Sequence, residues 1–158
     1  MIFKTKYKKT ILIIFSIALV TIIAIIKYRS GEINYLNADA TWHTLLTIKA
    51  YNETPMNVHH FIPIVSIGDD KGIPWGATIP DNYGNYYYTS FSPAGYIFPW
   101  IFIKIFNLPI AESSIYLFNS ILFLLSSVLW GNLIYHIYRK SKYALLIGII
   151  GVLTYTVS

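Results

Sequence analysis

Three long runs without a charged side chain stand out along the chain. They cover residues 10–26, 113–138 and 143–158, and they consist mainly of aliphatic and aromatic side chains. A helix that crosses a bilayer needs about 20 apolar residues, within a range of roughly 17–25. The first two runs therefore predict transmembrane helices, and the third predicts a transmembrane helix that stops short of its far flank.

The segment between the first two runs, residues 27–112, is more polar and has a pattern of its own. Apolar positions recur at near-helical spacing between residues 39 and 51, which predicts an amphipathic helix with Asn37 or Asp39 as its N-cap. Residues 55–93 are punctuated by Gly, Pro, Asn and Asp. This composition predicts loops with at most a small hairpin and no core of their own.

Residues 95–108 are apolar again, but they do not form a pattern suited to crossing a bilayer. The stretch is too short for a span, and Pro99 and Lys104 interrupt it. A short apolar helix with Trp100 and neighbouring tyrosines suits the boundary between membrane and water. The pattern therefore predicts an interfacial helix on the outer surface.

The charged residues predict the orientation of these helices. Basic residues gather in residues 1–9 and 139–142, whereas all seven acidic residues fall in residues 27–112. Lys and Arg are enriched on the cytoplasmic side of spanning helices. We therefore expect residues 1–9 and 139–142 in the cytoplasm and residues 27–112 outside it. The net charge of +5 then reflects topology, and it gives no reason to expect a nucleic-acid partner.

The composition agrees with a membrane protein. Charged residues make up 12% of the chain, against about 25% in a soluble domain. The absence of cysteine excludes disulfides, thiolate catalysis and Cys-ligated zinc.

A cleaved signal peptide is the alternative for the first run. However, the small-x-small triplet Ala38-Asp39-Ala40 lies too far from the apolar core to be a normal cleavage site. We expect an all-α integral membrane protein with two to three transmembrane helices, a long extracytoplasmic loop holding amphipathic and interfacial helices, and little or no β structure.

Two segments of the outer loop carry a resemblance to a known family. The first is Asp39-Ala40-Thr41-Trp42-His43 with the helix after it, and the second is the Tyr-rich segment Tyr87–Tyr96. Placed between two spanning helices, they resemble the amino-terminal part of the GT-C glycosyltransferases, polytopic membrane enzymes that use polyprenyl-phosphate sugars. Many relatives have a second acidic residue beside the position of Asp39, and a His-Pro-Pro-like turn where this chain reads Phe91-Ser92-Pro93. Family members are also several times longer.

The resemblance implies that Asp39 corresponds to the first-loop carboxylate that acts at the acceptor. A carboxylate within hydrogen-bond reach can take the proton of a hydroxyl group. His43, four residues later on the same helix face, is a candidate for orienting the substrate. Lys104 is a candidate for a lipid phosphate, and Tyr87 and Tyr88 are candidates for stacking on a sugar or an isoprenoid chain.

Each of these residues also has a structural explanation. Asp39 can cap its helix, and His43 can pack beside Trp42. Lys104 can extend its ammonium group from an interfacial helix into water. The tyrosines can belong to the aromatic belt that marks a membrane interface.

Neither a metal site nor another cofactor is expected. In an extended stretch, the adjacent His59 and His60 would point in opposite directions. The pair Asp69-Asp70 precedes Lys71-Gly72, so a solvated turn explains it more simply than a divalent-cation site does.

Two functions are compatible with these features. The first is the amino-terminal segment of a membrane glycosyltransferase that moves a sugar from a polyprenyl-phosphate donor to an extracytoplasmic acceptor, inactive without the remaining helices of a longer chain. The alternative is a small non-enzymatic membrane protein whose outer loop binds a partner protein or a lipid. In both cases we expect a multi-pass protein of the cell membrane with a cytoplasmic amino terminus.

Overall fold

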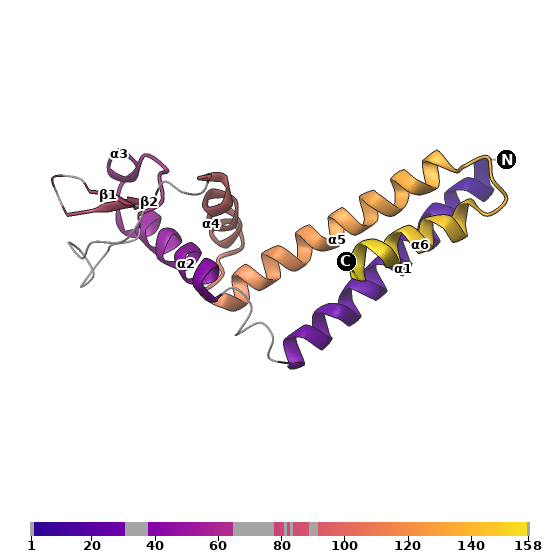
Figure 1. Cartoon of the computed structure of the whole chain (residues 1–158), viewed down its shortest axis with the longest axis horizontal. Coiled ribbons are helices and arrows are strands. Elements are labelled where there is room, and N and C mark those ends of the chain that lie inside the picture. The colour runs from indigo at the N-terminus through magenta and orange to yellow at the C-terminus, as the bar shows by residue number, and fades with distance from the viewer. Residues whose placement is uncertain are drawn as a thin grey trace. The chain divides into compact units, whose positions relative to one another are not determined.

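The computed structural model describes residues 2–30, 38–64, 78–80, 82, 84–88 and 92–157. This part is mostly helical, as predicted, and has little strand. The helices are α1 (Ile2–Ser30), α2 (Ala38–Glu53), α3 (Met56–His59), α4 (Ala94–Phe106), α5 (Glu112–Ile137) and α6 (Ala144–Val157), and the strands are β1 (Thr78–Pro80) and β2 (Tyr86–Tyr88) (Figure 1).

The chain folds into two compact units. Unit 1 contains residues 1–33 and 119–158, and unit 2 contains residues 34–118. The predicted amphipathic helix at 39–51 corresponds to α2, and the predicted interfacial helix at 95–108 corresponds to α4. Both helices belong to unit 2.

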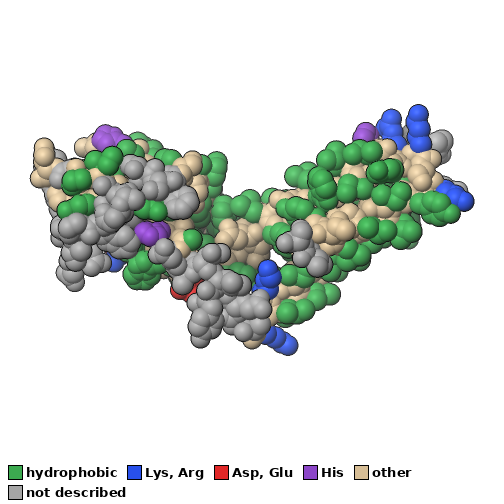
Figure 2. Space-filling view, in the orientation of Figure 1, with side chains coloured by type: hydrophobic (Ala, Val, Ile, Leu, Met, Phe, Trp, Pro, Cys, Tyr) green, Lys and Arg blue, Asp and Glu red, His purple; other side chains and the backbone are tan. Residues whose placement is uncertain are grey.

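Two helices are long and apolar enough to cross a membrane. They cover Tyr7–Arg29 and Glu112–Ile137. Only 17% of the most apolar 18-residue stretch of the first helix, and 11% of that of the second, is buried inside the protein. Figure 2 shows hydrophobic side chains along this face of unit 1, with Lys and Arg at helix ends. The core helix of a water-soluble domain would bury such side chains. The third predicted span corresponds to α6, which has 14 residues and is shorter than a spanning helix requires.

Unit 1 is held together where α1, α5 and α6 approach closely. Leu12 of α1, Tyr135 of α5, and Ala144 and Val152 of α6 form one buried cluster. Gly131 makes this approach possible, because a Cβ atom there would overlap Val152 and lie 3.3 Å from Leu12. Small residues serve the same purpose at helix interfaces in membranes.

Unit 2 is built on the contact between α2 and α4. Ile48 of α2, Ile103 of α4 and Ile115 at the start of α5 form one buried cluster, with partly buried Leu45, Trp100 and Leu108 packed against it. Helix α4 ends at Phe106 and is capped by Asn107, which adopts a left-handed conformation with φ of 49°. The N–H of Leu108 then donates to the carbonyl of Ile103 at 3.0 Å, a bonding pattern common at helix C-termini.

The described part of the turn-rich segment packs onto α2. Strands β1 and β2 pair antiparallel, with Thr78 opposite Tyr88. Ile64 forms a bridge to Tyr87 of β2, and these two residues pack with Ala50 of α2. The small hairpin considered from sequence is therefore present, and it shares its core with α2.

Candidate functional site

Asp39 is the second residue of α2, so it lies in the first turn of the helix rather than before it. A negative charge in the first turn is stabilised by the helix dipole. The side chain of Asp39 lies outside the described part of the structure, as do Asn37, Asp69 and Asp70. The acceptor-activating role of Asp39 therefore remains a prediction from sequence.

His43 is buried and stacks on Tyr88 of β2. The two ring centroids are 5.0 Å apart, and the ring planes differ by 12°. Trp42, the alternative neighbour of His43, is exposed. The structure therefore brings together two of the predicted site residues from segments that are far apart in sequence.

Tyr87 and Tyr88 lie on the same strand but have different surroundings. The hydroxyl group of Tyr87 donates to the carbonyl oxygen of Val58 at 2.8 Å, which fixes the hairpin to the end of α3.

Burial, and then the neighbouring Tyr88, raise the pKa of Tyr96 on α4. Burial, and then Tyr96, raise the pKa of Tyr51 on α2. Tyr96 and Tyr51 therefore remain protonated at neutral pH and can act as hydrogen-bond donors.

Sequence analysis missed an aromatic cluster formed by Tyr51, His59, Phe61 and Trp100. Tyr51 lies 4.7 Å from His59, 6.1 Å from Phe61 and 5.7 Å from Trp100, measured between ring centroids. Phe61 lies 5.2 Å from His59 and 5.9 Å from Trp100. These residues come from α2, α3, the turn after α3, and α4, so no single periodicity in the sequence could have identified the cluster.

The prediction that His59 and His60 lie in an extended stretch is wrong. His59 ends the short helix α3, and His60 and Phe61 both have left-handed backbone conformations, with φ of 47° and 58°. A helix of one turn leaves too few residues to show a periodic pattern. The left-handed conformation costs roughly 1–2 kcal/mol per residue, so other contacts must hold this turn.

Two hydrogen bonds stabilise the strained turn. The backbone N–H of Phe61 donates to Nδ1 of His59 at 2.9 Å, and the hydroxyl group of Tyr51 donates to the carbonyl oxygen of Phe61 at 2.7 Å. Because Nδ1 accepts a hydrogen bond, the neutral imidazole carries its proton on Nε2. Burial, followed by the charges of His60 and Lys104, lowers the pKa of His59, so this neutral form is favoured at pH 7.

Lys104 lies at the edge of the aromatic cluster. Its ammonium group is 4.7 Å from the centroid of the Trp100 ring, within the range of a cation–π interaction. The indole N–H of Trp100 donates to Oδ1 of Asn52 at 3.0 Å. Among the described residues, an ion pair joins Lys49 to Glu53. Lys104 makes no ion pair with any of these residues.

The described residues contain no group of three or more His, Asp or Glu side chains that could hold a metal ion.

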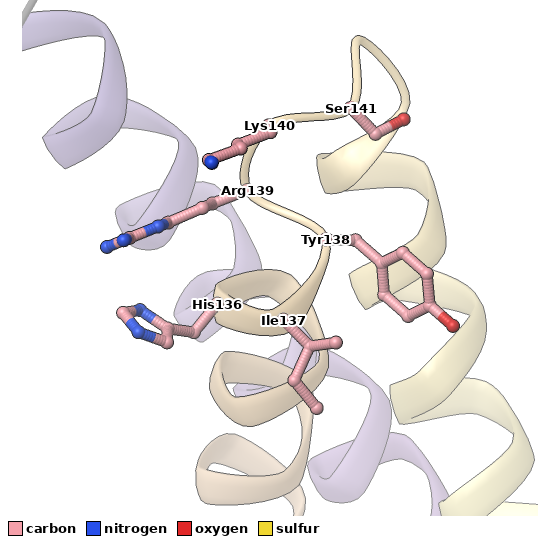
Figure 3. Close-up of a pocket in the computed structure, with 6 residues that line it drawn as sticks. All are labelled: His136, Ile137, Tyr138, Arg139, Lys140 and Ser141. Atoms are coloured by element: carbon pink, nitrogen blue, oxygen red, sulfur yellow. The ribbon is translucent and has the colours of Figure 1, made fainter.

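An open pocket in unit 1 is lined by residues 136–141, at the turn between α5 and α6. His136, Arg139 and Lys140 point to one side of this turn, whereas Tyr138 points to the other (Figure 3). The pocket contains none of the residues predicted to act on a substrate.

No protein-family model, curated protein or solved structure matches the chain.

Proposed function

We propose that this chain is the amino-terminal segment of an integral-membrane glycosyltransferase related to the GT-C enzymes. The complete enzyme transfers a sugar from a polyprenyl-phosphate donor to an acceptor outside the cytoplasm. The segment alone is inactive, because further helices supply much of the donor pocket. It is a multi-pass protein of the cell membrane whose amino terminus is cytoplasmic and whose unit 2 lies outside.

The placement in the membrane is supported by the surfaces of α1 and α5. Most of their apolar side chains are exposed, and lipid is the solvent that accepts such a surface. Arg139 and Lys140, which follow α5, are exposed and suit the cytoplasmic side.

The observation that carries the proposal is the stacking of His43 on Tyr88. These residues belong to the two segments on which the resemblance to the family rests. Asp39 lies one helical turn before His43 and therefore on the same face of α2. An acceptor bound near Tyr88 would meet the helix face that carries the proposed catalytic carboxylate.

The chemistry of this surface suits a sugar hydroxyl group. The Asp39 carboxylate would accept the proton that the attacking hydroxyl loses. The protonated Tyr96 would donate a hydrogen bond to a sugar oxygen, since burial raises the pKa of its phenol. Tyr88 would offer a ring face to the sugar.

Sugar transfer by the complete gene product tests this proposal. Membrane vesicles would be supplied with radiolabelled polyprenyl-phosphate sugars, and label that reaches an extractable acceptor would be counted. We expect Asp39→Asn to lower transfer by about 100-fold or more, the usual contribution of a general base. The matched control is Glu53→Gln, which removes an exposed carboxylate from the other end of α2 and should leave transfer unchanged.

Two results would contradict the proposal. Equal activity of Asp39→Asn and the unmodified protein would remove Asp39 from catalysis. Absence of transfer with every polyprenyl-phosphate sugar would favour the non-enzymatic alternative, in which unit 2 binds a partner protein or a lipid.

A further inference from the structure

Two hydrogen-bond donors lie beside the Trp100 ring: the ammonium group of Lys104 and the side-chain amide of Asn52. Lys104 lies over the ring at 4.7 Å, and Asn52 is hydrogen bonded to its indole N–H. Both Lys104 and Asn52 are exposed. We call these two residues the donor site.

The bonds already made within the protein determine what the donor site can offer. Trp100 can only donate, so Asn52 must use its oxygen for that bond and has its NH₂ group left over. With the Lys104 ammonium, the site presents donors and one positive charge, which suits an anionic oxygen such as that of a phosphate group.

The exposed face of α4 indicates where such a phosphate would come from. Phe98, Ile101 and Ile105 follow a helical spacing, and 62%, 39% and 70% of their surfaces are exposed. The opposite face, with Tyr96 and Ile103, is buried. A helix with an exposed apolar face beside a lysine is typical of helices that lie in a membrane interface. The apolar face would lie among acyl chains, with the lysine at the level of the lipid headgroups.

We propose that Lys104 and Asn52 bind the phosphate group of an anionic phospholipid beside Trp100. The apolar face of α4 contacts the acyl chains of the same membrane leaflet. This inference rests on the membrane placement of the proposed function but not on sugar transfer. The site anchors unit 2 to the outer surface of the bilayer through one specific headgroup contact.

Native mass spectrometry of the full chain in detergent tests the proposal. Phosphatidylglycerol would be titrated as the anionic probe, with phosphatidylcholine and inorganic phosphate in separate titrations. We expect Lys104→Gln to weaken phosphatidylglycerol binding by about tenfold, as is typical for the loss of a charged hydrogen bond. The matched control is Lys49→Gln, which removes an exposed lysine from α2 and should leave binding within about twofold of the unmodified chain.

A second variant separates binding from folding. In Asn52→Asp, a carboxylate oxygen can still accept from the indole N–H of Trp100, while the NH₂ donor is lost and a negative charge is added. This variant should keep its thermal stability at pH 7 and bind phosphatidylglycerol several-fold more weakly.

Three outcomes would overturn the inference. Equal losses in Lys104→Gln and Lys49→Gln would indicate non-specific attraction, and unchanged binding in Lys104→Gln would exclude the site. Inorganic phosphate that binds as tightly as phosphatidylglycerol would exclude a lipid as the ligand. Any of these results obtained with sugar transfer intact would overturn this inference and leave the proposed function standing.

Discussion

His59 shows how one side chain can hold two neighbouring residues in a costly backbone conformation. Its Nδ1 accepts the N–H of Phe61 while Tyr51 binds the carbonyl oxygen of the same residue. The bond to Nδ1 depends on the neutral imidazole, because a protonated ring cannot accept at Nδ1. Backbone strain of this kind persists only where the surroundings over-determine it, and it is concentrated at functional sites.

At the residue scale, we predict that acidification destabilises unit 2 through His59. Its pKa is lowered in the folded protein, so between that value and about 6.5 the unfolded chain binds a proton that the folded chain excludes. The contribution of His59 to the free energy of unfolding is therefore fully present above about pH 6.5. This contribution falls as the pH drops toward the pKa of His59 in the folded protein. The loss is limited to about 1.4 kcal/mol for each unit by which the pKa is lowered.

Thermal unfolding midpoints at pH 7 and pH 5 measure this effect. His59→Asn should lose less stability between the two pH values than the unmodified chain, because asparagine does not titrate. An identical pH dependence in the two proteins would show that His59 does not carry the effect.

At the scale of elements, the close approach of helices in unit 1 depends on small residues. A Cβ atom at Gly131 of α5 would overlap Val152 of α6. Valine has little rotamer freedom in a helix, so its side chain cannot easily turn away. In contrast, a Cβ atom at Gly95 of α4 would meet nothing within 4 Å.

We predict opposite effects for the same substitution at these two positions. Gly131→Ala should destabilise the protein by roughly 1–3 kcal/mol, because the helix interface is overpacked. Gly95→Ala should stabilise it by up to about 1 kcal/mol, the difference in helix propensity. Unfolding midpoints in detergent would measure both changes, and a stabilising effect of Gly131→Ala would contradict the observed packing.

At the scale of the whole molecule, the charges determine the orientation that we propose. Basic residues gather in the first nine residues and in residues 139–142, while six of the seven acidic residues lie between the two long apolar helices and the seventh, Glu112, is the first residue of the second. From these charges, the positive-inside rule predicts that both basic segments are cytoplasmic. Unit 2 would then fold outside it.

Cysteine labelling tests this topology cleanly because the chain has no cysteine of its own. In intact cells, a membrane-impermeant maleimide should label Met56→Cys, an exposed position in α3, but not Lys142→Cys. After the membrane is disrupted, Lys142→Cys should also react. Leu125→Cys, which is exposed on α5, should stay unreactive because lipid covers it. Labelling of Lys142→Cys in intact cells would reverse the orientation, and rapid labelling of Leu125→Cys would remove α5 from the membrane.

The sequence by itself determined four of the helices, α2, α4, α5 and α6, with their limits to within about two residues. Length and spacing of apolar residues are local properties, so α2, α4 and α5 could be predicted without knowledge of their partners. The predicted first span, residues 10–26, lies inside the longer α1. The one-turn helix α3 was missed because four residues carry no periodic signal.

Only the tertiary structure decided which of the candidate residues meet. The stacking of His43 on Tyr88 and the cluster of Tyr51, His59, Phe61 and Trp100 join segments that are distant along the chain. Such contacts depend on how α4 and the hairpin pack onto α2, and that packing is a non-local property of the whole unit. Residue chemistry indicated that Lys104 could meet a phosphate, but only packing placed its ammonium group over the ring of Trp100, whose indole N–H is bonded to Asn52.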